Sequence, residues 1–288
     1  MKQFLILVLA SFFLNQALAQ RNNKKFEKEV AALMKGFNGS IGIYVKDLKK
    51  GKTISINADT IFPTASMVKI PILVVVMDKL NRGELAFNQN LQYRDSLLYE
   101  GVDILGSFKD SATIELGKVV MLMLTMSDNT ASLWLQSLAG KGTRINEILD
   151  SMGFAKTRVN SRTPGREANR TEFGWGQTTP KEMAMLMEKI VNGQVISKEH
   201  SAQMLRLLGR NYWDAHAISQ IPSDVFVASK GGAVDKSRSE VLFVNGKGAR
   251  YIFCISTKNN KDESWEKDNE AWVLTRKISG LLWNYFSN

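Results

Sequence analysis

Cysteine and histidine are scarce in this chain, which has one Cys and two His among its 288 residues. Because Cys254 has no second cysteine to pair with, an internal disulfide is excluded and the fold must be stabilised by packing. We interpret Cys254 as a small buried hydrophobe. With one cysteine, His200 and His216 do not supply the usual ligands of zinc, and we expect no metal and no cofactor. Composition alone permits a Ser-His-Asp triad, but neither histidine lies in the context of a nucleophile elbow.

Internal repeats, low-complexity linkers and nucleic-acid-binding signatures are also absent from the sequence. The formal net charge is +10, and a basic protein can bind nucleic acid, anionic surfaces or acidic substrates. The lysines and arginines are scattered along the chain rather than gathered in one stripe, so we expect no nucleic-acid partner. An anionic cell-wall substrate or a carboxylate-bearing substrate suits the expected compartment, outside the cytoplasm, better. We expect the protein to be a monomer.

A hydrophobic run at the amino terminus indicates an export signal. Lys2 supplies a short positive region, Phe4–Leu14 is apolar, and Ala17-Leu18-Ala19 matches the small-x-small cleavage rule. The run is too short and too weakly flanked for a stable membrane span. We therefore predict a cleaved signal peptide at residues 1–19 and a periplasmic or secreted protein without a stable membrane anchor.

Hydrophobic periodicity divides the remaining chain into strands, then helices, then strands again. Residues 24–36 show a helical pattern, and residues 40–58 alternate as two strands joined by a turn. The two sets of strands can share one sheet only if the helical block between them is an insertion. Strand patterns return after this block at 225–229, 240–245 and 251–257, and a helical pattern covers 270–286.

We therefore predict an α/β (α+β) sandwich, in which terminal helices flank an antiparallel sheet and an all-helical domain is inserted. The α/β domain comprises residues 20–62 and 212–288, and the helical domain comprises residues 63–211. A cleft between the sheet layer and the helical block is the expected site.

Ser66 and Lys69 carry the strongest local signal of chemistry. In a helix, residues three apart lie on one face, so the Lys69 amine can reach the Ser66 hydroxyl. Pro71 places Ser66 at a helix start, because proline is tolerated only in a first turn. Free backbone N–H groups and the positive end of the helix dipole would then surround Ser66 and could form an oxyanion hole. Alone, Ser-x-x-Lys is weak evidence, because chance matches are common.

Two further motifs follow along the chain. Ser127-Asp128-Asn129 precedes a helical pattern, and its simplest interpretation is a helix N-cap, which would also fix Ser127 and Asn129 at the lip of a cleft. Ser229-Lys230-Gly231-Gly232 ends an apolar strand, where Lys230 can face a substrate that approaches the backbone closely. A solvated lysine before a hairpin turn is the alternative for this motif.

The three motifs together, in this order, resemble those of the class A β-lactamase and penicillin-binding-protein group, which has Ser-x-x-Lys, Ser-Asp-Asn and Lys-Thr-Gly. The resemblance runs from about Lys24 to Phe286. It implies the β-lactamase and transpeptidase fold, with Ser66 as the acylated nucleophile and Lys69 as its base. By the same resemblance, Ser127 is a catalytic residue that relays the proton to the leaving nitrogen.

The resemblance also implies a set of substrate-binding residues. Asn129 holds the substrate amide, and Lys230 supports both Ser127 and the substrate carboxylate. Gly232 and Ala233 are further substrate-binding residues, and the Ala233 N–H is the second oxyanion donor beside that of the nucleophile.

The chain departs from the family pattern in two places. Gly231 stands where the family has Ser or Thr, whose hydroxyl helps to grip the β-lactam carboxylate. Thr163-Pro164 stands where a catalytic Glu followed by Pro is expected, and Glu167 comes four residues later. We hypothesise that Glu167 is the catalytic carboxylate that activates water, because residues four apart share a helix face. The alternative is that Glu167 pairs with Arg166 or Arg170 on an exposed loop.

The expected function is that of an exported serine hydrolase of the β-lactamase type. It would act through a Ser66 acyl-enzyme on a β-lactam or a related carboxylate-bearing amide, and could confer antibiotic resistance. One alternative is a D-alanyl-D-alanine peptidase or transpeptidase that acts on a peptidoglycan-like amide. Another is a degenerate family member that binds, or is acylated, without turnover. If Glu167 is not the base, Lys69 and Glu172 are the next candidates.

Overall fold

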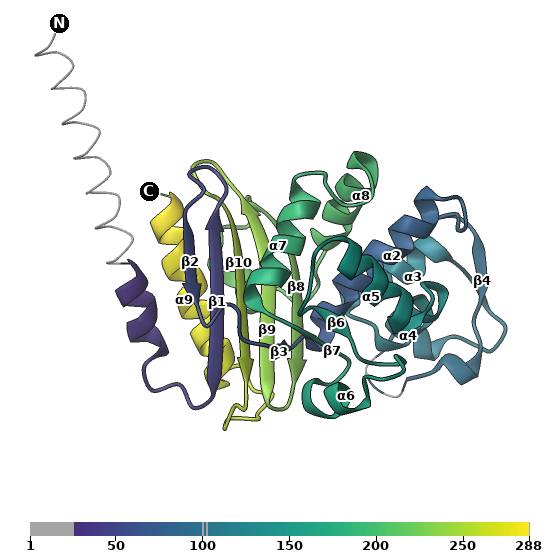
Figure 1. Cartoon of the computed structure of the whole chain (residues 1–288), viewed down its shortest axis with the longest axis horizontal. Helices are drawn as coiled ribbons and strands as arrows, with labels where there is room; N and C mark the ends of the chain where they lie inside the picture. Colours follow the sequence, from purple (N-terminus) through teal and green to yellow (C-terminus); the bar gives the residue numbers. More distant parts are fainter. Residues whose placement is uncertain (1–25, 100, 102, 288) are drawn as a thin grey trace, which may run out of the picture.

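A five-stranded antiparallel sheet is built from both ends of the chain (Figure 1). Its order is β2-β1-β10-β9-β8, so the chain leaves the sheet at one edge and returns to it at the other. This arrangement confirms the predicted fold class, because everything between β2 and β8 is inserted into the sheet. The five strands are β1 (Ser40–Asp47), β2 (Thr53–Ile56), β8 (Phe226–Val234), β9 (Ser237–Asn245) and β10 (Arg250–Lys258).

The structure is a computed structural model and describes residues 26–99, 101 and 103–287. The signal peptide predicted at residues 1–19 lies outside the described residues. Within the described part of the chain, no helix has both the length and the apolarity needed to cross a membrane. The domain boundaries expected at residues 62–63 and 211–212 stay a prediction.

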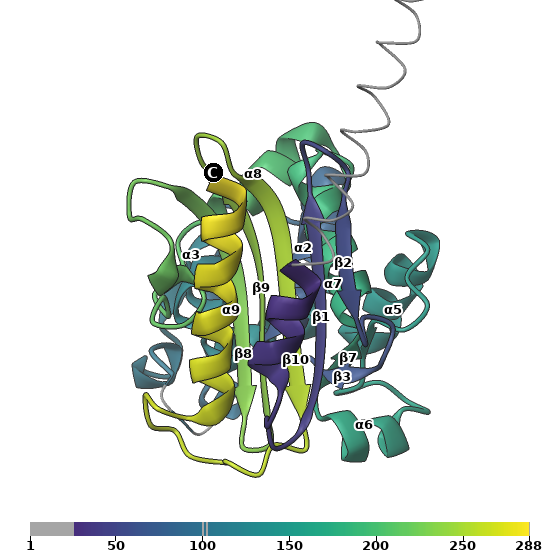
Figure 2. The same ribbon diagram turned by 90° about the vertical axis from the view of Figure 1, so that its left-hand side faces the viewer.

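Both faces of the sheet are buried, and successive residues of each strand supply the two faces in turn. On β9, Val244 packs with the terminal helices, whereas Phe243 packs with the helical region on the other side. α9 (Glu270–Ser287) and a helical segment at residues 26–34 lie side by side across the first face (Figure 2). α7 (Pro180–Val191) lies across the second face.

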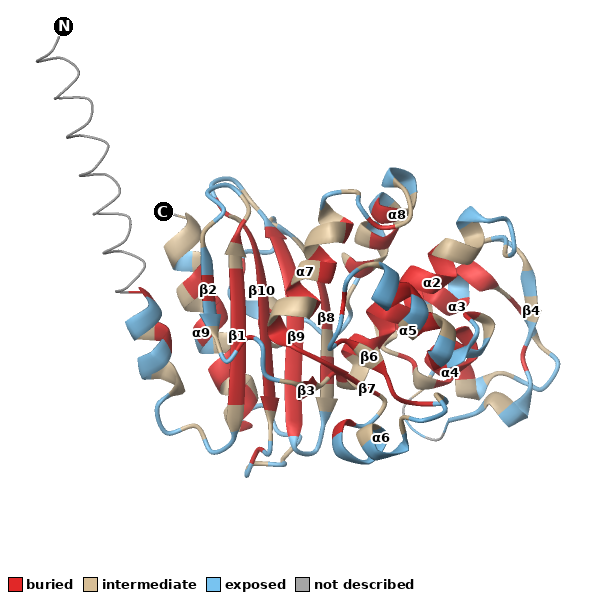
Figure 3. Ribbon diagram, in the orientation of Figure 1, coloured by how far each residue is buried: buried red, intermediate tan, exposed pale blue. Residues whose placement is uncertain are grey.

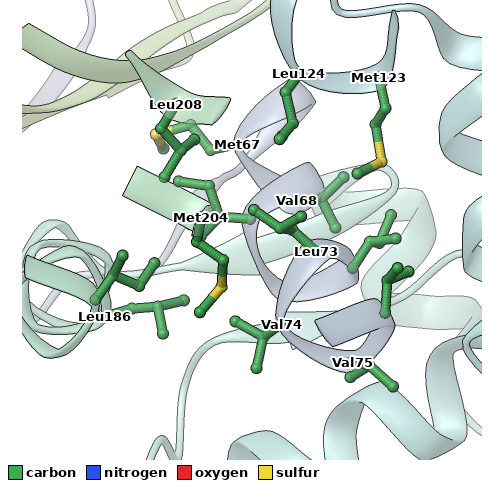
Figure 4. Close-up of a cluster of buried hydrophobic side chains, with 14 of the residues drawn as sticks. Met67, Val68, Leu73, Val74, Val75, Met123, Leu124, Leu186, Met204 and Leu208 are labelled. Atoms are coloured by element: carbon green, nitrogen blue, oxygen red, sulfur yellow. The ribbon is translucent and has the colours of Figure 1, made fainter. Parts of the chain in front are cut away.

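The helical region is built around α2 (Lys69–Asn81), which is buried on all sides along its first nine residues (Figure 3). Its run of Ile, Leu, Val and Met has no polar face, as is typical of a helix surrounded by other elements. Figure 4 shows Leu73, Val74 and Val75 among leucine and methionine side chains of neighbouring elements. The other helices of this region are α3 (Leu116–Met121), α4 (Asn129–Leu138), α5 (Lys141–Ser151) and α8 (Lys198–Leu208).

Short elements that hydrophobic periodicity did not predict connect these helices. α6 (Glu167–Phe173) is mostly exposed and lacks an apolar stripe, and strands of two or three residues are too short to show alternation. One small sheet contains β3 (Phe62–Pro63), β7 (Gly176–Thr178) and β6 (Arg158–Val159), and another contains β4 (Asn90–Gln92) and β5 (Thr113–Glu115). Three single helical turns are η2 (Asp95–Leu97), η3 (Leu105–Ser107) and η5 (Ile218–Gln220).

β8 is longer than the sequence pattern indicated. The apolar strand predicted at 225–229 continues to Val234, and the hairpin to β9 turns after that residue. Lys230 therefore lies inside an edge strand rather than at a strand end, and the interpretation of a solvated lysine before a turn is wrong. Glycine is unusual in a strand interior, so Gly231 and Gly232 weakened the strand signal at this point.

Leu73 is fully buried in α2, so we expect Leu73→Ala to lower the free energy of unfolding by about 2–5 kcal/mol. The loss combines the transfer of the side chain with the cavity that remains. Met121→Ala on α3 is the matched control, since Met121 is 49% exposed and should change stability by less than about 1 kcal/mol. Urea denaturation measures both variants, and equal losses would contradict the central position of α2.

Candidate active site

Ser66 lies at the start of the central helix. The 3-10 turn η1 (Ala65–Val68) runs directly into α2, and Ala65 has a left-handed backbone with a φ of 43°. Such a conformation is costly for a residue other than glycine and is common where surrounding contacts hold the chain for function. Pro71 lies in the first turn of α2, as predicted. Ser66 is therefore fixed at a helix start, where unpaired backbone N–H groups are found.

Lys69 lies one turn after Ser66, and its side chain is fully buried. Its Nζ lies 3.0 Å from Ser66 Oγ, 3.0 Å from Ser127 Oγ and 2.9 Å from Asn129 Oδ1. It also donates to the Ser127 carbonyl oxygen at 2.5 Å. Burial first, and the charge of Lys230 second, hold the pKa of Lys69 well below the ordinary lysine value. The Lys69 amine is thus available as a proton acceptor at a lower pH than an ordinary lysine.

The Ser127-Asp128-Asn129 segment follows a π-helical turn, η4 (Leu122–Met126). Ser127 has a left-handed backbone with a φ of 59°, which turns the chain sharply between η4 and α4. Asp128 is the N-cap of α4, and its carboxylate accepts from the Ala131 N–H at 2.8 Å. The N-cap interpretation of this motif is therefore confirmed. The cap holds Ser127 and Asn129 beside Lys69.

A second carboxylate, which sequence analysis missed, fixes the beginning of α4. Asp103 accepts from the backbone N–H of Asn129 at 2.9 Å and from that of Thr130 at 2.7 Å, and from the Thr130 hydroxyl at 2.8 Å. These bonds position the backbone from which the Asn129 side chain reaches Lys69. Asp103 lies in a loop without helical or strand periodicity, so no sequence signal connected it with Asn129.

Lys230 approaches Ser127 from the sheet. Its Nζ lies 3.0 Å from Ser127 Oγ and donates to the Gly231 carbonyl oxygen at 3.0 Å. Burial lowers the pKa of Lys230 to about 8, and the nearby Glu240 carboxylate opposes that shift. Ser127 Oγ therefore lies between two lysine nitrogens, an arrangement in which a hydroxyl can receive one proton and donate another. The structure thus brings the three predicted motifs together.

Gly232 allows β8 to come close to Ser66. A Cβ atom there would lie 2.4 Å from the Thr64 carbonyl oxygen and 2.8 Å from the Ser66 nitrogen, closer than side chains tolerate. A Cβ atom at Gly231 would meet only the Ser239 carbonyl oxygen, at 3.9 Å, and the Gly231 backbone is not left-handed. Packing therefore requires glycine at position 232, whereas Gly231 leaves an open space.

Two cavities meet at Ser66. Asn129 and Ala233 line both of them, and Gly232 lines the larger one. The smaller cavity, of about 510 Å³, also includes Tyr99, Glu172 and Trp175, and the rings of Tyr99 and Trp175 meet edge to face at 5.1 Å. The larger cavity, of about 880 Å³, extends past the motif residues to Trp213, His216, Glu240, Trp272 and Arg276.

Glu167 is the predicted site residue that the structure does not place with the others. It is exposed in the first turn of α6, accepts from the Gly165 N–H at 3.1 Å, and lines neither cavity. Arg166 donates to Asn160 Oδ1 at 2.7 Å rather than to Glu167. Glu172, later in α6, is the carboxylate of this loop that lines the cavity of Ser66.

The shared-face argument for Glu167 fails because α6 begins only at that residue. No turn of helix connects it with Thr163, the residue in the place of the family's catalytic glutamate. The Thr163 hydroxyl donates to the Val159 carbonyl oxygen at 3.1 Å and to that of Ser161 at 3.0 Å. It lies against Gly142 of α5, where a Cβ atom would be 1.6 Å from Thr163 Oγ1. Thr163 therefore contacts the wall of the helical region and lines neither cavity.

Comparisons with known proteins agree with this arrangement. A model of the beta-lactamase enzyme family matches residues 25–286. The chain is 22% identical to Beta-lactamase VEB-1 of Pseudomonas aeruginosa over 297 residues, which cover 99% of this chain and 98% of that protein.

Solved structures show the same fold. PBP-A has a TM-score of 0.80 at 23% identity and covers 91% of this chain and 96% of its own. A beta-lactamase from Sphaerobacter thermophilus has a TM-score of 0.79 at 23% identity and covers 88% and 95%. A mutant of PBP-A has been solved as an acyl-enzyme complex with penicillin G. At these identities the likeness establishes the fold alone.

The contrast between the two glycines of β8 predicts different effects of the same substitution. Gly232→Ala should slow labelling of Ser66 by a phosphonate probe by about tenfold or more, because the new methyl group displaces the Ser66 backbone from its position. Gly231→Ala is the matched control, and its labelling rate should stay within about threefold of wild type, since its methyl group enters open space. Labelling is followed by intact mass; equal rates for the two variants would contradict the close approach of β8 to Ser66.

Proposed function

Because the chain belongs to the beta-lactamase enzyme family, we propose that it is a serine hydrolase that forms an acyl-enzyme through Ser66 with a β-lactam or a related carboxylate-bearing amide. The observation that carries this proposal is the contact of 3.0 Å between Lys69 Nζ and Ser66 Oγ, made by a buried amine with a lowered pKa. A serine hydroxyl becomes an effective nucleophile when an adjacent base can take its proton.

The proposed first half-reaction uses the residues of the three motifs. Lys69 takes the proton of Ser66 as Oγ attacks the substrate carbonyl carbon, and the backbone N–H groups of Ser66 and Ala233 stabilise the oxyanion. Ser127 then donates its proton to the leaving nitrogen while the amide bond breaks, and it regains a proton from a neighbouring lysine. The balance is one proton moved from Ser66 to the leaving nitrogen. Asn129 holds the substrate amide.

Hydrolysis of the acyl-enzyme needs a second base, which takes a proton from water. Among the described residues between Asn160 and Gly176, Glu172 is the carboxylate that lines the cavity of Ser66. We propose Glu172 for this role on the basis of that position, and Glu167 remains the candidate from sequence. Position in the cavity favours Glu172, because a general base must come within hydrogen-bond reach of the water.

A second candidate function is a D-alanyl-D-alanine peptidase or transpeptidase that is acylated by β-lactams and releases them slowly. The observation that favours it is the place of Thr163, whose hydroxyl is engaged by the carbonyl oxygens of its own loop. A threonine so placed does not activate water. The limiting case of slow release is a degenerate family member that binds, or is acylated, without turnover. Export through the predicted signal peptide agrees with both functions, since cell-wall substrates and β-lactams are met outside the cytoplasm.

We expect penicillin G to add its full mass to the protein, with the adduct on Ser66, because opening of a β-lactam ring retains every atom of the ligand on the enzyme. Intact mass detects the adduct and peptide mapping locates it. Ser66→Ala should abolish the adduct, whereas Ser137→Ala, an exposed serine on α4, should leave it unchanged. An adduct that survives Ser66→Ala would overturn the proposed nucleophile.

Two glutamates of α6 separate the candidates for the second base. Glu172→Gln should lengthen the lifetime of the penicillin adduct by about 10²–10⁴-fold while the rate of its formation changes little. Glu167→Gln removes the same charge from the same helix and should leave the lifetime unchanged. The decay of the adduct by intact mass measures both. The opposite ranking would assign the role to Glu167, and no effect of either variant would leave Lys69 as the base.

A further inference from the structure

The open space at Gly231 lies directly beside a buried carboxyl group. Gly231 and Glu240 are Cα partners in the β8–β9 ladder, and partners in a ladder direct their side chains to the same face of the sheet. A Cβ atom at Gly231 would meet nothing closer than 3.9 Å. The space that a side chain at Gly231 would fill is therefore open toward the Glu240 side of the strand.

Glu240 belongs to the same cavity as the nucleophile. Its side chain is buried, with 4% of the residue exposed, and it lines the cavity of about 880 Å³ together with Ser66 and Lys230. One carboxyl oxygen accepts from the Ala217 N–H at 3.1 Å. A carboxylate with one lone hydrogen bond to the backbone keeps acceptor capacity for a ligand.

The cations that line this cavity are engaged in different ways. Lys230, from β8, is the charge that acts on Glu240. The Arg238 side chain, from β9 itself, lies between the rings of Trp265 and Trp272 at 4.5 Å and 4.7 Å and donates to the Ser264 carbonyl oxygen. Arg238 is therefore committed to its own surroundings.

The remaining titratable groups come from the elements packed over β9. From α9, Arg276 donates to the carbonyl oxygen of Lys267, whose own side chain also lines the cavity. From the loop before η5, His216 is stacked on Trp272 at 4.4 Å, and burial lowers its pKa to about 4, so it is neutral. The Asp103 carboxylate lies in the same cavity but is occupied by the start of α4. Glu240, the ladder partner of Gly231, is thus a carboxyl group of this cavity that keeps acceptor capacity.

We propose that Glu240 determines the charge specificity of this site: it disfavours a substrate carboxylate in the space beside Gly231 and favours a neutral group there. This inference rests on the proposed function and narrows its substrate class. Lys230 attracts a substrate carboxylate, and in a site without Glu240 that attraction would be unopposed. Here the Glu240 charge opposes the attraction that Lys230 exerts and repels the incoming anion. Carboxylate-bearing β-lactams then acylate Ser66, but more slowly than neutral relatives do.

The discrimination against an anionic substrate depends on pH, and the direction of this dependence follows from the pKa values of Glu240 and Lys230. Burial raises the pKa of Glu240 to about 7, so the carboxyl is neutral below that pH and charged above it. Lys230 stays charged until its pKa of about 8. Discrimination against an anionic substrate therefore increases as the pH rises through neutrality, while Lys230 is still protonated.

The experiment compares penicillin G with its methyl ester, in which a neutral ester that is larger by one methyl group replaces the carboxylate. Acylation rates are measured by intact mass for wild type, Glu240→Gln and Glu147→Gln. The glutamine can keep the bond from Ala217, and Glu147 is an exposed residue of α5, so its variant matches the loss of one charge. Glu240→Gln should raise the rate with penicillin G by at least about tenfold and change the rate with the ester by less than about threefold.

The pH dependence of wild type gives a second readout that needs no variant. The ratio of the penicillin G rate to the ester rate should fall between about pH 6 and about pH 7.5, and Glu240→Gln should remove that fall. If Glu240→Gln changes the acylation rates of the two compounds equally, the role of Glu240 is overturned. The same holds if the fall in the rate ratio persists in this variant. Either result would leave the proposed function intact. No Ser66 adduct with either compound would overturn the proposed function, and this inference with it.

Discussion

Among the described residues, Lys69 is buried with no acidic side chain in contact, and this is the constraint on which the site depends. A buried ammonium group is unfavourable, and the folded protein responds by lowering the pKa of Lys69. Its three hydrogen-bond partners, Ser66, Ser127 and Asn129, are neutral groups. They satisfy the amine without fixing a charge on it. A carboxylate in their place would hold the proton and remove the base.

This constraint also makes the site unfavourable for stability. Lys69 and Lys230 both have lowered pKa values, so between those values and the ordinary lysine range the unfolded chain binds protons that the folded chain does not. Stability therefore increases as the pH rises through that range. The left-handed backbones of Ala65 and Ser127 add local strain. The apolar packing of α2, in the core of the helical region, compensates for these costs.

Much of the fold and part of the site could be predicted from the sequence, and the reason is the same for both. Ser66 and Lys69 are three residues apart on one helix, so their contact follows from helix geometry. The alternation of residues between the two faces of β1 and β10 likewise follows from local strand geometry, so these strands of the sheet could be predicted. By contrast, the relation of Glu240 to Gly231 is a register between two strands, and no local period encodes it. α6 escaped notice because an exposed helix has no apolar stripe, and the hypothesis for Glu167 depended on where that helix begins.

The two departures from the family pattern lie outside the connected hydrogen bonds of Lys69, Ser127 and Lys230. Lys69, Ser127 and Lys230 form one connected set of contacts, so the loss of any member would leave a buried polar group without its partner. Gly231 and Thr163 have no such role: the first borders open space, and the second is satisfied by its own loop. We therefore expect substitutions at these two positions to leave the contacts of Lys69 with Ser66 and Ser127 in place. The packing around Ser66 is thus compatible with both proposed functions, the hydrolysis of β-lactams and a cell-wall peptidase activity that β-lactams inhibit.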